Sequence, residues 1–211
     1  MKPRTPGFGL IVATVGLLTL LPMRATAGMT PEEVLKFETR KALAEKGDAK
    51  GQHMLGECYI FGTGVAKNYT EAAKWHLKSA LQGYAEGQLA IGFDYGFGYG
   101  VGKSYPEAVK WYRKASEQGV AWAQHQMGLS YDQGLGVTKD SVEAYAYYSL
   151  ASTPSTARPK GTNRSSWAPA LEKLKILEKK LSPEARLKGQ QRSKELQKEI
   201  DANIAAQNAG K

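Results

Sequence analysis

The stretch GQHMLGECYIFGTGVAKNYTEAAKWHLKSALQG, residues 51–83, decides the fold, because the chain repeats its pattern twice more without an insertion. The counterparts begin at Gly87 and Ala123, so the period is 36 residues. Four columns carry the repeat: Gly47, Gly83, Gly119; Gln52, Gln88, Gln124; Tyr59, Tyr95, Tyr131; and Ala72, Ala108, Ala144. A fixed period of this length is typical of a solenoid, in which each repeat buries its apolar face only by stacking on a neighbour. The period predicts an all-α solenoid with repeats over 48–83, 84–119 and 120–151.

Each repeat divides into two predicted helices joined by a glycine turn. Leu55 and Tyr59 share one face of the first helix, helix A, which we expect over 49–61. It ends at two glycines with one residue between them: Gly62 and Gly64, Gly98 and Gly100, Gly134 and Gly136. Glycine reaches positive φ without steric cost, which suits a helix cap followed by a tight reversal. We expect the valines that follow, Val65, Val101 and Val137, to turn inward and fill the bend.

Helix B begins at a capping signature that recurs in all three repeats. A polar cap residue is followed three positions later by glutamate: Asn68 and Glu71, Ser104 and Glu107, Asp140 and Glu143. Such capping boxes satisfy backbone N–H groups that have no partner inside the helix. Farther along, each helix B offers a small residue for close approach and a large one that we expect to fill the space opposite: Ala72 and Trp75, Ala108 and Trp111, Ala144 and Tyr147.

The N-terminal residues 1–27 have the pattern of a secretory signal. Lys2 and Arg4 precede an apolar run over 8–21, and Ala25-Thr26-Ala27 supplies small residues for cleavage. The alternative, a transmembrane anchor, needs roughly 20 apolar residues, and this run is shorter. We expect export to the periplasm or the exterior after cleavage near Ala27. Residues 28–47 then form a capping helix, with Thr30 as its N-cap.

The C-terminal region departs from the repeat. Pro154, Pro159 and Gly161 indicate a loop over 152–166, and basic helices follow over 167–211. The first of these helices carries an apolar stripe from Leu171 to Leu181 and is expected to cap the solenoid. The second begins at Pro183 and offers only a thin apolar line: Leu196, Ile200 and Ile204. Two interpretations stay open for it, partial packing on the solenoid or a free basic arm.

Charge and residue types exclude several classes of function. Residues 28–151 carry a net charge of −1 and residues 152–211 a net charge of +7, so the basic character belongs to the tail and predicts no nucleic-acid partner. Cys58 is the single cysteine of the chain, which rules out an internal disulfide, and we expect a small half-buried helix residue. His53 and His125 share a column, but two layers of packed helices separate them by roughly 20 Å, too far for one metal ion. We expect no enzyme activity, no cofactor and no metal.

The pattern AxxQxxxGxxYxxGxGV followed by ExAxxWxxxA resembles the Sel1-like repeat, a relative of the tetratricopeptide repeat. It is carried over residues 47–151 by Ala49, Gln52, Gly56, Tyr59, Gly62, Gly64, Val65, Glu71, Ala72 and Trp75, and by their counterparts, among them Gly92, Tyr95, Gly98, Gly100, Ala108, Trp111, Gly128, Tyr131, Gly134, Gly136, Ala144 and Tyr147. The resemblance implies a right-handed α/α superhelix that acts as an adaptor and binds proteins on its concave face. Some cysteine-rich members have been linked to β-lactam binding, and this chain lacks their paired cysteines.

Departures from the pattern are the candidate partner-binding residues, because consensus positions serve packing. Trp122 replaces the charged Lys50 and Glu86 of its column. Further candidates are the aromatic residues of the turns: Phe61, Phe97 and Tyr99. Exposed aromatic residues are favoured anchors at interfaces, and contact with the C-terminal helices is the alternative. The leading hypothesis is an exported adaptor for an envelope or secreted protein; the second is a factor that binds anionic lipid or cell-wall polymer through the basic C-terminal helix.

Overall fold

The computed structural model describes residues 28–153 and 167–209. The predicted signal peptide over 1–27 and most of the predicted loop over 152–166 lie outside these residues. In the described ranges, no helix combines the length and the apolar character needed to cross a membrane.

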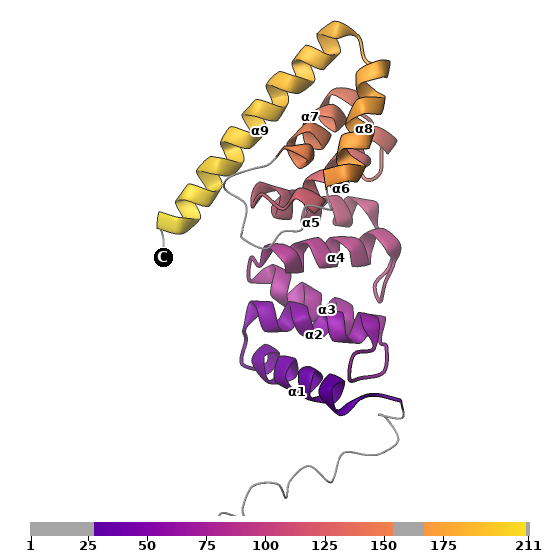
Figure 1. The fold of residues 1–211 in the computed structure, drawn as a ribbon, viewed down its shortest axis with the longest axis vertical. Helices are drawn as coiled ribbons and strands as arrows, with labels where there is room; N and C mark the ends of the chain where they lie inside the picture. The colour runs from indigo at the N-terminus through magenta and orange to yellow at the C-terminus, as the bar shows by residue number, and fades with distance from the viewer. Residues whose placement is uncertain (1–27, 154–166, 210–211) are drawn as a thin grey trace, which may run out of the picture.

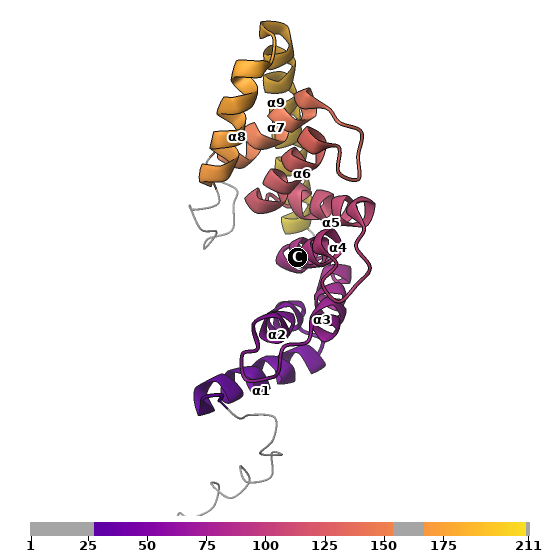
Figure 2. The same cartoon turned by 90° about the vertical axis from the view of Figure 1, so that its right-hand side faces the viewer.

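The described residues form nine helices, of which α1 to α7 stack in chain order into one column, while α9 runs back along its side (Figure 1). Their bounds are α1 Pro31–Glu45, α2 Ala49–Phe61, α3 Tyr69–Leu81, α4 Ala85–Phe97, α5 Tyr105–Glu117, α6 Ala121–Gln133, α7 Ser141–Ser152, α8 Trp167–Lys180 and α9 Pro183–Ala209. Each helix from α1 to α7 packs against the next, so α2, α4 and α6 are the A helices and α3, α5 and α7 the B helices. The column is curved, and α1 and α8, at its two ends, both lie to the left of the middle helices in Figure 2. The predicted all-α solenoid is confirmed.

Glycines end every helix A, as the sequence predicts. Gly62, Gly98 and Gly134 cap α2, α4 and α6 with φ of 75°, 80° and 74°. The second glycine of each pair also has positive φ and touches an earlier helix: Gly64 touches α1, and Gly100 and Gly136 touch the starts of α3 and α5. At Gly100, a Cβ atom would collide with the backbone of Tyr69 and Thr70. The turn therefore joins two repeats as well as two helices.

Gly100→Ala is expected to destabilise the fold by about 1–3 kcal/mol more than Gly83→Ala, the usual cost of overpacking. Both glycines have positive φ, 69° and 84°, so both variants bear the same backbone strain. Only Gly100 meets another backbone, because nothing lies within 4 Å of a Cβ at Gly83. Urea unfolding of the two variants measures the difference. Equal midpoints would mean that the second glycine of the turn does not contact the preceding repeat.

The caps of the B helices are present, but the glutamates behave differently from the prediction. The side chains of Asn68, Ser104 and Asp140 each accept a hydrogen bond from the backbone N–H three residues on. The cap residues' own N–H groups donate to the carbonyls of the repeated tyrosines: Tyr59, Tyr95 and Tyr131. That contact leaves no N–H for the glutamates. Their carboxylates instead pair with cations: Glu71 with Lys74, Glu107 with Lys110, and Glu143 with Arg192.

In each repeat, the ring that is buried in the core belongs to the residue one position after the tryptophan or tyrosine that we predicted. Trp75 and Trp111 are half-buried: each packs against a core cluster, and a lysine, Lys78 or Lys114, lies over its ring. The prediction that these tryptophans fill the space between the helices therefore holds only in part. Tyr147, in the same column, is buried because α9 covers it. The central rings belong to the next column: His76, Tyr112 and Tyr148.

A glycine of helix A makes room for each of these rings. A Cβ at Gly92 would lie 2.6 Å from Cδ1 of Tyr112, and one at Gly128 would lie 2.6 Å from Cδ1 of Tyr148. Gly56 stands in the same relation to His76. A glycine inside a helix costs roughly 1 kcal/mol relative to alanine, so its recurrence indicates a close approach. This glycine–ring contact joins the two helices of every repeat.

Cys58 is fully buried rather than half-buried. The guanidinium of Arg40, on α1, donates a hydrogen bond of 3.2 Å to its sulfur. Its column partners Asp94 and Ser130 are buried as well. This column therefore faces the inside of the repeat.

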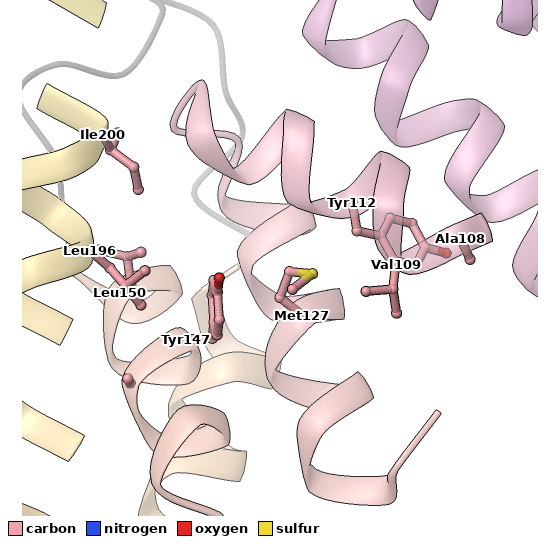
Figure 3. Close-up of a cluster of buried hydrophobic side chains, with 9 residues drawn as sticks. Ala108, Val109, Tyr112, Met127, Tyr147, Leu150, Leu196 and Ile200 are labelled. Atoms are coloured by element: carbon pink, nitrogen blue, oxygen red, sulfur yellow. The ribbon is translucent and has the colours of Figure 1, made fainter. Parts of the chain in front are cut away.

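Both C-terminal helices pack on α7. From α8, Ala170, Leu174 and Leu177 join a cluster with Tyr145 and Tyr148. From α9, Leu196 and Ile200 enter the largest core cluster (Figure 3). Of the two interpretations of α9, packing on the solenoid is therefore correct and the free basic arm is wrong.

Candidate interaction surface

Exposed aromatic side chains gather at the A–B turns. Phe61 and Phe97 are the last residues of α2 and α4, and 64% and 60% of their surfaces are exposed. Tyr99, inside the second turn, is 44% exposed. Because these residues stand at helix ends, they lie on the edge of the column that holds the turns. We call this surface the turn edge.

The aromatic rings of the turn edge stack on one another. The centroid distances are 5.2 Å between Tyr69 and Tyr99, 5.5 Å between Tyr99 and Phe97, and 6.0 Å between Phe97 and Phe93. Stacked rings lose little rotamer freedom when a partner covers them, which lowers the cost of binding. The row therefore offers a preorganised apolar surface across two repeats.

Trp122 has a different environment from the one predicted. It is half-buried, stacks on His125 at 5.4 Å and meets Phe93 at 6.4 Å. It also packs against the small core residues Ala115 and Ala123. These contacts with α4, α5 and α6 show that Trp122 joins the second and third repeats, so the prediction of a solvated anchor is wrong for this residue. Among the described residues, no ring contact or core cluster joins Trp122 to the C-terminal helices, which was the alternative.

A small pocket of about 160 Å³ lies beside Phe97. It opens between the second and third repeats and can hold one apolar side chain of a partner. Its lining comprises Gly96, Phe97, Lys103, Tyr105, Ala108, Tyr112, Gln126, Leu129, Ser130 and Leu135. The residues that contribute most to binding at protein interfaces are often aromatic and often fill a pocket of the partner, so a pocket next to exposed rings suits such an interface.

A wider groove of about 860 Å³ lies at the opposite edge, between the B–A turns and the end of α9. Amide and charged side chains form much of its wall, including Gln82, Gln118 and Gln207. Among its lining residues, Tyr84 is aromatic, and no row of stacked rings like that of the turn edge lines it. It is the competing surface for any test of binding.

Two histidines and a carboxylate meet in the first repeat. His53 and Glu57 on α2 and His76 on α3 bring possible ligand atoms within 4.8 Å of one another. The Nδ1 atom of His76 is 2.7 Å from Oδ2 of Asp94. Burial lowers the pKa of His53 to about 4, with smaller contributions from His76 and Arg40, so its ring is neutral at neutral pH.

The two histidines that meet in the structure are His53 and His76. His125 packs with Trp122 and Tyr148, whereas the ring of His53 lies 5.6 Å from that of His76. The signal in the sequence is His76, which stands where the other repeats have Tyr112 and Tyr148. The ion pair of Arg192 with Glu143, at 3.0 Å, has no signal in the sequence, because it joins segments that are far apart in the chain.

Comparison with solved structures finds two informative relatives. A protective antigen of uropathogenic Escherichia coli strains with an SLR fold is similar over 83% of this chain, at 28% identity and a TM-score of 0.56. A Sel1 repeat protein from Oxalobacter formigenes is similar over 58% of this chain, at 34% identity and a TM-score of 0.50. The matches span only 43% and 54% of those two chains. A search of curated proteins found no match.

The family model of the Sel1 repeat matches three consecutive segments: residues 49–84, 85–120 and 123–153. Each segment holds one helix A, one glycine turn and one helix B of the structure. The period, the glycine turns and the similar solved structures agree with this match. Residues 49–153 are therefore three Sel1 repeats, and the chain belongs to the Sel1-repeat family.

Proposed function

We propose that this chain is an exported adaptor that binds an envelope or secreted protein along its turn edge. Sel1 repeats generally mediate protein–protein interaction, and the family is typically a non-catalytic scaffold. The observation that carries the choice of surface is the stacked row Tyr69, Tyr99 and Phe97 beside the pocket. Export rests on the signal pattern of residues 1–27.

The basic C-terminal helix supports the lipid or polymer hypothesis poorly. Its apolar residues Leu196 and Ile200 are buried against the solenoid and cannot enter a lipid surface. Arg192 is already paired with Glu143 and Glu199. The rings of the turn edge stack on one another, yet Phe97 and Tyr99 remain 60% and 44% exposed.

The double variant Phe97→Ser, Tyr99→Ser is expected to lose capture of the partner from an envelope extract by about tenfold or more, because hot-spot residues contribute about 2 kcal/mol or more each. Its melting temperature stays close to that of the parent, since exposed substitutions change stability by less than about 0.5 kcal/mol. Quantitative capture, repeated at raised salt, measures this. An interaction through lipid or polymer charge would fade at raised salt, because exposed charges are then screened.

Leu81→Ser is the matched control. Leu81 is 70% exposed and ends α3, next to the groove residue Gln82 at the opposite edge. This variant should capture the partner as the parent does. Loss of capture by Leu81→Ser, with capture retained by the double variant, would assign the partner to the groove and refute the turn edge.

A further inference from the structure

The first repeat has three polar side chains that meet in space, and a fourth polar side chain joins them from the second repeat. Where the first repeat has His53, Glu57 and His76, the second repeat has Leu89, Phe93 and Tyr112, and the third has His125, Leu129 and Tyr148. The fourth side chain is that of Asp94 on α4, whose column partners are Cys58 and Ser130. At the positions of Glu57 and His76 both other repeats have apolar or tyrosine side chains, so the fold does not need these two polar groups. At the position of His53 the third repeat also has a histidine, and the second repeat has a leucine.

The arrangement of the three donors suits one metal ion. His53 and Glu57 are four residues apart on α2, so they share one face of the helix. His76 reaches the same place from α3, and all three ligand atoms lie within 4.8 Å of one another. Donors around a tetrahedral zinc ion are roughly 3.3 Å apart, given bonds of about 2.0–2.2 Å. Closing the site therefore needs side-chain adjustments of little more than about 1 Å.

Asp94 orients the central histidine. Its carboxylate is 2.7 Å from Nδ1 of His76, and both side chains are almost fully buried. With Nδ1–H donating to the carboxylate, Nε2 carries the free lone pair. That nitrogen is buried and has no hydrogen-bond partner among the described residues, and the same holds for Nδ1 of His53. A carboxylate behind a ligating histidine fixes the tautomer in this way at many metal sites.

The charges around the cluster suit a dication. Glu57 and Asp94 supply two negative charges, and the neighbouring cation Arg40 directs its guanidinium to the carbonyl of Met54 and the sulfur of Cys58. Two imidazoles and one carboxylate are the ligands of zinc and related transition metals, whereas calcium and magnesium prefer oxygen donors alone. His53 and Glu57 are half-buried, which gives an ion a route from solvent.

We propose that His53, Glu57 and His76 bind a divalent transition-metal ion, with Zn²⁺ as the best match, and that Asp94 is the positioning residue for His76. The ion joins α2 to α3 and, through Asp94, connects the first repeat to the second. Water completes its coordination. The site is independent of the turn edge, so its test does not depend on the proposed function.

Titration of the purified chain, without an affinity tag, with Co²⁺ and Zn²⁺ tests the proposal. We expect one ion per chain, a Co²⁺ absorption spectrum of a four- or five-coordinate site, and a rise in melting temperature that a chelator reverses. His76→Tyr and His53→Leu introduce the residues of the second repeat and should keep the fold. Each is expected to weaken binding by about 100-fold or more, because a ligand matters more than its outer-shell partner, whose loss costs about 10–100-fold.

The variant Asp94→Ser tests whether Asp94 positions the ring of His76 for the metal ion or serves only the packing of the core. Serine stands at the equivalent position of the third repeat, and the expected loss of affinity is about 10–100-fold with one ion still bound. His125→Leu is the control: it removes a histidine of the same column as His53 and should bind Zn²⁺ as the parent does. The proposal is overturned if the parent chain binds no Zn²⁺ at about 100 μM, well above ordinary site affinities. It is equally overturned if His53→Leu and His76→Tyr bind as tightly as His125→Leu.

Discussion

Leu196→Ala is expected to destabilise the protein by about 2–5 kcal/mol, the range for emptying a buried leucine site. Leu196 is 6% exposed and packs with Leu150 and Tyr147 in the largest core cluster. Leu187, on the same helix, is 66% exposed, and Leu187→Ala should change stability by less than about 0.5 kcal/mol. Denaturant unfolding of the two variants makes a comparison in which the residue type and the helix are the same.

The same contacts predict the behaviour of a shortened chain. A chain that ends at Leu181 lacks α9, so Tyr147, Leu150 and the α7 face around Tyr145 become exposed. We expect this chain to melt well below the parent and to aggregate. A truncated chain that melts like the parent, together with a harmless Leu196→Ala, would restore the interpretation of α9 as a free arm.

Tyr148→Ala is expected to cost about 3–5 kcal/mol, the range for a large aromatic residue in a core. Among the described residues, Tyr148 is the largest fully buried side chain, and its ring lies against Gly128 of α6. The packing of α6 on α5 limits how far its backbone can move into the space. The variant should therefore retain a cavity and unfold at a lower denaturant concentration.

Trp75→Ala is the control for Tyr148→Ala. Trp75 is half-buried under Lys78, so part of its surface already faces solvent. We expect a smaller loss, about 1–3 kcal/mol, in proportion to the apolar area removed from the protein. A larger loss for Trp75→Ala than for Tyr148→Ala would show that the tryptophan column, and not the ring on glycine, holds the repeats together.

Local signals in the sequence were enough to predict where the helices begin and end. Helix A over 49–61 has the predicted bounds, because Gly62 ends it by a conformation that other residues rarely adopt. The cap residues place the start of helix B in the same way, since the hydrogen bond that the Glu71 N–H donates to the Asn68 side chain spans only three residues. Such signals need no knowledge of tertiary contacts.

The contacts between distant segments could not be predicted in this way. Periodicity places Trp75 and His76 next to each other on α3, and only the packing of α2 decides which ring is central. The apolar line of α9 is visible in the sequence, but its partner residues on α7, Tyr147 and Leu150, lie more than 40 residues earlier in the chain. Trp122 shows the same limit, because a large side chain in a charged column fits either an interface or a gap between repeats.

The proposed metal-ligand cluster could be predicted from the sequence only in part. His53 and Glu57 form a local pair that the helical spacing places on one face. The third donor, His76, is recognised only when the first repeat is compared with the other two at the ring position. The positioning residue, Asp94, belongs to the next repeat and needs the structure.

Site-specific photo-cross-linking tests the assignment of the turn edge most directly. A photoreactive phenylalanine analogue replaces Phe97 in one chain and Leu81 in another, and each chain is irradiated in envelope extract. The account predicts that the chain labelled at position 97 becomes covalently joined to the protein that the parent captures, while the chain labelled at position 81 does not. A cross-link to that protein from position 81, with none from position 97, would contradict the account.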